Sequence, residues 1–398
     1  MSLLHRPSDL LLLSTAQALY WSCSIIGITL TGLVGQQLAP WPWLSTLPLA
    51  LLVAGCLLAV GRTARSLATR GAQRTLQRGA LYGVAGGLLS ALGISLHSFA
   101  LFSVGVLCVG AYQASAGFYR FVALDRVDAP YQGRAAAWVV AGGIAAALVA
   151  PSVALYSQPL LPTPMAGSYL AVAVLAALGV LVLQALRAVP LPASAAPATA
   201  QAATTRSALW QRPGIRLALL LAAGGHGVMI LVMNATPLAM GQHGHSLAAS
   251  ATVIQWHVLG MFVPSLFAGS AVDRWGPHRV AAVGLVLLAA SCAWALSGLA
   301  HSQFLISSLL LGAGWNALML AGTCLLTQSC STAERRTAQP MMEWTNSALG
   351  AAMSLASGAL VHTLGWQAIN WAMLPVLALM LWCLMQPQRL SVPPAAHS

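Results

Sequence analysis

Twelve apolar stretches, each about long enough to cross a membrane as a helix, dominate this 398-residue sequence. Crossing the ~30 Å hydrocarbon layer takes roughly 20 apolar residues in helical form. Because 58% of the residues are hydrophobic and only 6% are charged, the chain cannot be a water-soluble globule. We therefore predict an all-α membrane protein with twelve transmembrane helices. The stretches lie at residues 10–36, 43–61, 79–97, 98–119, 134–156, 167–186, 215–240, 247–271, 279–298, 302–328, 340–362 and 366–386.

The arginines indicate how these helices are oriented. The chain contains no lysine, and once the twelve stretches are drawn, every arginine falls on one side of the membrane. Cytoplasmic loops carry the excess of basic residues in membrane proteins. We therefore expect a multi-pass protein of the bacterial cytoplasmic (inner) membrane, embedded in the lipid bilayer with both termini in the cytoplasm. The formal net charge of +12 thus reflects membrane topology and does not indicate nucleic-acid binding. The arginines are Arg6, Arg62, Arg65, Arg70, Arg74, Arg78, Arg120, Arg126, Arg134, Arg187, Arg206, Arg212, Arg216, Arg274, Arg279, Arg335, Arg336 and Arg389.

One connection differs in composition from the others. The segment "VPLPASAAPATAQAATTRS", residues 189–207, is rich in Pro, Ala, Ser and Thr and has too few bulky apolar residues to pack. It predicts a flexible cytoplasmic linker over residues 189–213 between an N-terminal six-helix half, 1–188, and a C-terminal six-helix half, 214–398. Two such halves are typical of transporters whose halves rock about a site near the bilayer midplane.

A cytoplasmic loop carries a recognisable signature. The sequence "GSAVDRWGPHR", residues 269–279, resembles the G-x-x-x-D-R-x-G-x-x-R signature of the major facilitator superfamily. The corresponding loop after the second stretch, residues 61–74, lacks the acidic residue. The resemblance implies a brace for the inward-closed arrangement, with Asp273, Arg274 and Arg279 as gating residues. The alternative is that Asp273 and Arg274 only cap helix ends at the membrane surface.

Sulfur and imidazole groups gather in the seventh and eighth stretches. Eleven of the 13 methionines lie in the second half of the chain. Met229 and Met233 are four residues apart, so they share one helix face. His257 and Met261 have the same spacing on the next stretch, and His226 lies three residues before Met229.

These side chains are expected at similar depth. If the turn between the two stretches is centred near His243, Met229 lies 14 residues before it and His257 lies 14 residues after it. Antiparallel helices then place both about 20 Å from the tip, near the middle of the bilayer. The same count places His226 level with Met261. The donors could therefore converge where a transporter binds its cargo.

The donor types indicate a soft metal ion. Thioethers favour Cu(I), and imidazole suits both copper oxidation states. The chain has only six acidic residues and none lies deep in an apolar stretch, which disfavours calcium and magnesium. The alternative for the methionine pair is packing, since methionine fills gaps between helices. Histidines at membrane depth are costly and often functional. No nucleophile and base are arranged for catalysis, so we predict neither an enzyme nor a resident cofactor.

The two pairs carry a closer resemblance. "MILVM", Met229 to Met233, and "HVLGM", His257 to Met261, are similar to the signature motifs of CcoA-type copper importers, a bacterial branch of the major facilitator superfamily. The resemblance implies copper uptake in support of cbb3-type cytochrome c oxidase assembly, with these four residues as metal contacts and His226 as a weaker one. It also makes a periplasmic or cytoplasmic copper donor or acceptor an expected partner. Related transporters of this branch are linked to riboflavin.

Two alternatives compete with copper uptake. An aromatic organic solute such as riboflavin would use Trp256, Trp315 and Tyr119 as stacking surfaces. That reading predicts that Met229 or Met261 can be replaced by leucine without loss of transport. A membrane sensor or assembly factor without transport activity is disfavoured, because the sequence has no sizeable domain outside the membrane.

Overall fold

The computed structural model describes residues 7–124, 126–127, 132–187 and 206–386, and within these ranges the chain is helical without β-strands. The all-α fold class is confirmed. The long helices are α1 (Pro7–Leu38), α2 (Leu47–Arg70), α3 (Ala72–Ser95), α4 (Phe99–Ala116), α6 (Gln132–Tyr156), α7 (Ala166–Gln184), α9 (Pro213–Gln242), α10 (Leu247–Phe262), α11 (Ser265–Leu296), α12 (His301–Gln328), α13 (Thr332–Thr363) and α14 (Gly365–Met385). Short helices are η1 (Pro42–Leu44), α5 (Tyr119–Leu124), η3 (Gln158–Leu160) and α8 (Arg206–Trp210).

The twelve long helices correspond to the twelve apolar stretches. In the described ranges, nine helical segments are long and apolar enough to cross a membrane. The segment that includes α10 continues to Phe267, and the next segment begins at Arg274, within α11. Helices α3, α6 and α13 occupy the remaining three stretches.

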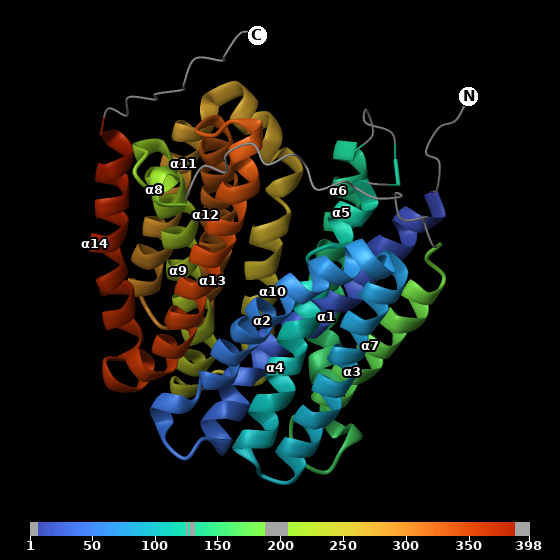
Figure 1. Ribbon diagram of the computed structural model, residues 1–398. Coiled ribbons are helices and arrows are strands. Elements are labelled where there is room, and N and C mark those ends of the chain that lie inside the picture. The colour runs from blue at the N-terminus through green and yellow to red at the C-terminus, as the bar shows by residue number, and fades with distance from the viewer. Residues whose placement is uncertain (1–6, 125, 128–131, 188–205, 387–398) are drawn as a thin grey trace.

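The helices form two bundles, α1–α7 and α9–α14 (Figure 1). One buried apolar cluster lies within the first bundle, and a larger one centred on the second also includes Ile25 of α1 and three alanines of α6. In the first, α1 packs against α6, and α3 packs against α4 and α7. In the second, α9 lies between α12 and α13, and α11 packs against α12. Most of the predicted linker, residues 189–205 of 189–213, lies outside the described residues. The end of that segment is helical instead, because α8 packs through the buried Leu209.

Both bundles expose most of their described arginines at one end. Helix α1 begins and α14 ends at this end, which we call the arginine end (Figure 1). Its exposed side chains come from loops and helix termini of both bundles. Among the described residues the exposed arginines are Arg62, Arg65, Arg70, Arg74, Arg78, Arg120, Arg187, Arg206, Arg216, Arg274, Arg279 and Arg335.

An ion pair braces each bundle near the arginine end. In the first bundle, the buried Asp9 at the start of α1 accepts from Arg126, which also donates to the Arg187 carbonyl. In the second, Arg212 at the start of α9 forms a two-pronged pair with Glu334, at 2.9 and 2.7 Å. Hydrogen bonding to Glu334 raises the pKa of Arg212 above its ordinary value. The first helix of the first bundle thus supplies the acidic partner, and the first long helix of the second bundle supplies the basic one.

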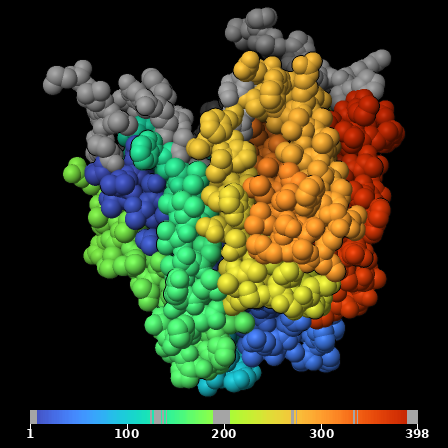
Figure 2. Space-filling model, turned by 180° about the vertical axis from the view of Figure 1, so that it is seen from behind, coloured from blue at the N-terminus to red at the C-terminus, as the bar shows by residue number. Residues whose placement is uncertain are grey.

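The halves touch at the opposite end and separate at the arginine end. The Thr46 hydroxyl donates to the Leu355 carbonyl at 3.1 Å and accepts from the Gly358 amide at 3.0 Å. These bonds join α13 to the start of α2. Figure 2 shows a notch between the halves at the arginine end and continuous contact below it. The structure is therefore the conformer that is open at the arginine end.

Candidate functional site

One face of α9 looks toward the centre between the halves. A Cβ on Gly224 would lie 2.9 Å from Met380, so this side of α9 faces α14. Successive residues of a helix turn by about 100°. His226, two residues later, therefore lies on the side away from α14, toward the centre.

His226 forms a hydrogen-bonded pair with an aromatic residue of α12. The Trp315 indole N–H donates to His226 Nδ1 at 3.0 Å, with the ring centroids 6.1 Å apart. Both side chains are half-buried. Because Nδ1 accepts this bond, the ring proton of a neutral His226 resides on Nε2. In this conformer His226, predicted as the weaker metal contact, is engaged with Trp315 through one nitrogen.

His257 is buried with one nitrogen held and the other free. Its side chain is fully buried, and Nδ1 lies 2.9 Å from the Ser308 carbonyl of α12. That contact makes Nδ1 the donor, so Nε2 carries a lone pair. Among the described residues Nε2 has no hydrogen-bond partner. Metal-binding histidines are typically oriented in this way, through a carbonyl on the nitrogen that does not bind the metal.

Helix α12 lies between the two predicted pairs of donors. Met229, Met233 and Met261 are buried, but α9 and α10 each pack along α12 and touch one another only sparingly. Asn316 of α12 donates to the Met261 carbonyl at 2.8 Å. Asn316 directly follows Trp315, the residue that bonds to His226. His226 and Met261 therefore lie at similar depth. Within the described residues, no three His, Cys, Asp or Glu side chains are grouped to hold a metal.

The signature loop forms a sharp corner within α11. Gly276 has φ 77° and ψ 158°, a conformation that favours glycine because a Cβ would be strained there. Gly71, between α2 and α3, has nearly the same angles, φ 79° and ψ 168°. Arg274 and Arg279 are exposed at this corner, and the side chain of Asp273 lies outside the described residues. The glycine thus makes the same corner in both halves, although the first loop has no acidic residue.

Only one of the three predicted stacking residues lies in the centre. Trp315 does, through its bond to His226. Tyr119 is fully buried within the first bundle, so the expectation that it offers a stacking surface is wrong for this conformer. Trp256 is 43% exposed and lies about 100° around α10 from His257, away from the side that packs on α12.

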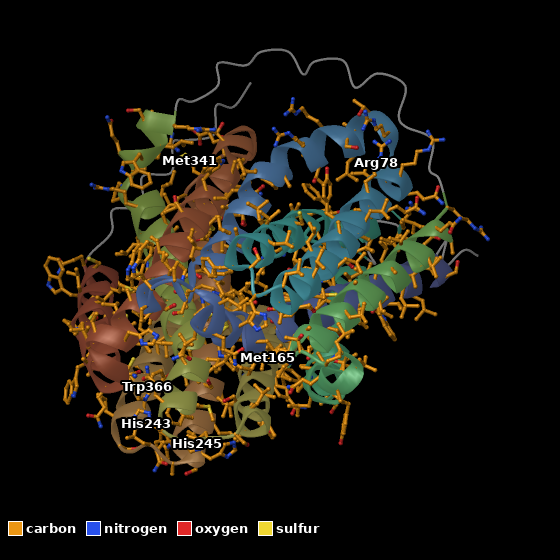
Figure 3. The ribbon with its side chains drawn as sticks, turned by 90° about the horizontal axis from the view of Figure 1, so that it is seen from below. Arg78, Met165, His243, His245, Met341 and Trp366 are labelled. Atoms are coloured by element: carbon orange, nitrogen blue, oxygen red, sulfur yellow. The ribbon has the colours of Figure 1, made fainter. Side chains whose placement is uncertain are left out.

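Histidines at the end opposite the arginines are engaged locally. Figure 3 shows His243 and His245 near one another, by the turn between α9 and α10. One ring nitrogen of His243 lies 2.8 Å from the Ala239 carbonyl. One ring nitrogen of His245 lies 2.8 Å from the Leu299 carbonyl. These contacts hold the turn against α9 and the start of α12.

Sequence reasoning missed an aromatic contact between the halves. Trp21 of α1 meets Phe262 of α10 edge-on, with centroids 4.7 Å apart and an interplanar angle of 79°. Gln17 lies one turn before Trp21 on the same face. The available signal was a glutamine and a tryptophan four residues apart inside an apolar stretch, since polar side chains at membrane depth often face a cavity.

Comparison with known proteins identifies the family. The family model of the Major Facilitator Superfamily matches residues 227–397. The riboflavin transporter RfnT of Brucella anthropi is 37% identical over 373 residues, which cover 94% of this chain and 94% of that protein. The chain belongs to the major facilitator superfamily. It is therefore a multi-pass membrane transporter and not an enzyme.

Solved structures of superfamily members share this fold. A crystal structure of a D-xylose-proton symporter superimposes with a TM-score of 0.76 at 14% identity, covering 96% of this chain and 98% of the other. A mutant of the nucleoside transporter NupG gives a TM-score of 0.74 at 16% identity, covering 95% and 99%. The resemblance to the superfamily is confirmed. Its narrower form, a copper importer, gains no support from these relatives, because the nearly full-length relative is a riboflavin transporter.

Proposed function

We propose that this transporter carries a planar aromatic solute of the riboflavin type across the membrane by alternating access. The observation that carries the proposal is the 37% identity to RfnT over 94% of both chains. The half-buried pair of Trp315 and His226 at the centre supports it. An indole ring held in place by a hydrogen bond is suited to stacking against a flat heterocycle.

The direction follows from the arginines. We propose that the arginine end faces the cytoplasm of a bacterial inner membrane, as the positive-inside rule requires. The conformer open at that end would then be the one that releases cargo inward. Cargo would reach the centre from the other side when the contact between Thr46 and Gly358 opens.

Closure of the arginine end would bring charged side chains of the two halves together. Glu343 of α13 is exposed and interacts electrostatically with Arg120 of the first bundle. We propose that this pair tightens as the cytoplasmic side closes. Asp273, Arg274 and Arg279, at the corner of α11, are proposed to brace the same closed state.

Copper is a second candidate cargo, favoured by one observation. The unpartnered Nε2 of His257 is a nitrogen ready to bind a soft metal ion. Met261 lies one turn away on the same face of α10, and Met229 and Met233 are buried across α12. A site formed from all four would need α12 to shift during the transport cycle.

The two cargoes are distinguished by paired uptake assays. Cells unable to make riboflavin would express the wild type, Trp315→Leu, or Met229→Leu with Met261→Leu, and uptake of radiolabelled riboflavin would be measured. We expect strong loss in the tryptophan variant and near-normal uptake in the methionine variant. Radiolabelled copper uptake would be measured in cells lacking other importers, with His257→Ala and Met233→Ala as variants. Riboflavin uptake no higher than in cells with an empty vector would contradict our proposal, and copper uptake lost in both variants would establish copper instead.

A further inference from the structure

Two adjacent glycines mark a point where helices of both halves meet. A Cβ on Gly142 of α6 would lie 2.4 Å from the Ser14 carbonyl oxygen and 3.3 Å from Gln17 Cβ, both on α1. A Cβ on Gly143 would lie 2.9 Å from the ring of Phe262 on α10. Helices α1, α6 and α10 therefore meet at one junction, with Gln17 and Phe262 on either side of it.

This junction lies at the boundary between the halves. Trp21, one turn from Gln17 on α1, touches the Phe262 ring and packs against the apolar clusters of both halves. The side chains of Gln17 and Trp21 remain partly exposed. Trp21 therefore lies at the boundary between the two halves, with Gln17 one turn away on the same helix.

The junction holds two polar atoms without partners. Gln17 Oε1 and Trp21 Nε1 are each buried, and neither has a hydrogen-bond partner among the described residues. Buried polar atoms are nearly always paired in native proteins, because leaving them unpaired is costly. One atom accepts and the other donates, and both come from one face of α1. A bound molecule with a neighbouring donor and acceptor would satisfy both.

We propose that Gln17 and Trp21 are specificity-determining residues that bind the imide edge of a planar heteroaromatic cargo. This inference rests on the proposed function. The ring system of riboflavin carries one edge on which an N–H lies between two carbonyl groups. Gln17 Oε1 accepts from that N–H, and the Trp21 indole N–H donates to a neighbouring carbonyl. Phe262 moves off the Trp21 edge and packs against the bound ring.

The test compares riboflavin with a derivative methylated on the imide nitrogen, which keeps the ring and both carbonyls but cannot donate. Each unlabelled compound competes against radiolabelled riboflavin uptake. In the wild type we expect the methyl derivative to compete about tenfold more weakly, the worth of roughly one hydrogen bond. In Gln17→Leu we expect the two compounds to compete about equally. Gln255→Leu, which changes a glutamine of α10 two turns before Phe262, should keep the wild-type difference.

A second variant tests the hydrogen bond donated by the Trp21 indole N–H. Trp21→Phe keeps an aromatic ring but has no N–H, so we expect riboflavin to bind about tenfold more weakly while the difference between the two compounds persists. The variants are checked for folding by size-exclusion chromatography in detergent. Absence of any riboflavin uptake by the wild type would refute the proposed function itself. Uptake with an unchanged difference in Gln17→Leu, or unchanged affinity in Trp21→Phe, would overturn this inference alone.

Discussion

The hydroxyl of Thr46 ties the halves together in the conformer open at the arginine end. It donates to the Leu355 carbonyl and accepts from the Gly358 amide, and both partners belong to the other half. Thr46→Val keeps the shape of the side chain and removes both bonds. Each bond is worth about 0.5–1.5 kcal/mol net, so the variant should lose about 1–3 kcal/mol from this conformer alone. That corresponds to a shift of about 5-fold to 150-fold toward conformers closed at the arginine end.

The shift can be measured as a distance between the halves. Spin labels at Thr69 on α2 and Gln328 on α12, both exposed at the arginine end, report its opening by double electron-electron resonance in protein lacking the seven native cysteines. We expect the population at short distance to grow in Thr46→Val. The matched control is Thr363→Val, because the Thr363 hydroxyl bonds only within its own helix, to the Ala359 carbonyl at 2.8 Å. An unchanged distance distribution in Thr46→Val would refute the assignment of these bonds to one conformer.

Two further substitutions test packing inside the halves. Arg126→Met leaves the buried Asp9 carboxylate without its arginine and should lower the free energy of unfolding by about 3–5 kcal/mol. Replacing both residues by leucine should lower it less. Thermal unfolding in detergent measures both variants, and an Arg126→Met protein as stable as the wild type would contradict the expectation. Gly312→Val should lower stability by at least about 1–3 kcal/mol and impair transport, because its Cβ would lie 2.3 Å from the His257 carbonyl oxygen. Gly61→Ala, with open space around the added carbon, is the control, and equal unfolding temperatures for the two glycine variants would argue against close contact of α10 with α12.

The sequence by itself determined the number of helices and the end at which the arginines lie. Both follow from local physics, because a membrane helix needs a fixed length of apolar residues and charged side chains stay at its ends. The signature at residues 269–279 also marked the loop in which the structure turns at Gly276, in a conformation that a residue with a Cβ adopts only under strain. The spacing of His257 and Met261 likewise fixed their common helix face.

The tertiary structure alone decided which faces meet. Spacing placed Met229 and His257 on neighbouring helices, but only the packing put α12 between those helices. It also brought Trp21 to Phe262, far away in the chain, and buried Tyr119 inside one bundle. The physical reason is that a membrane helix is apolar on nearly every side, so its hydrophobic pattern does not say which side faces lipid and which faces another helix.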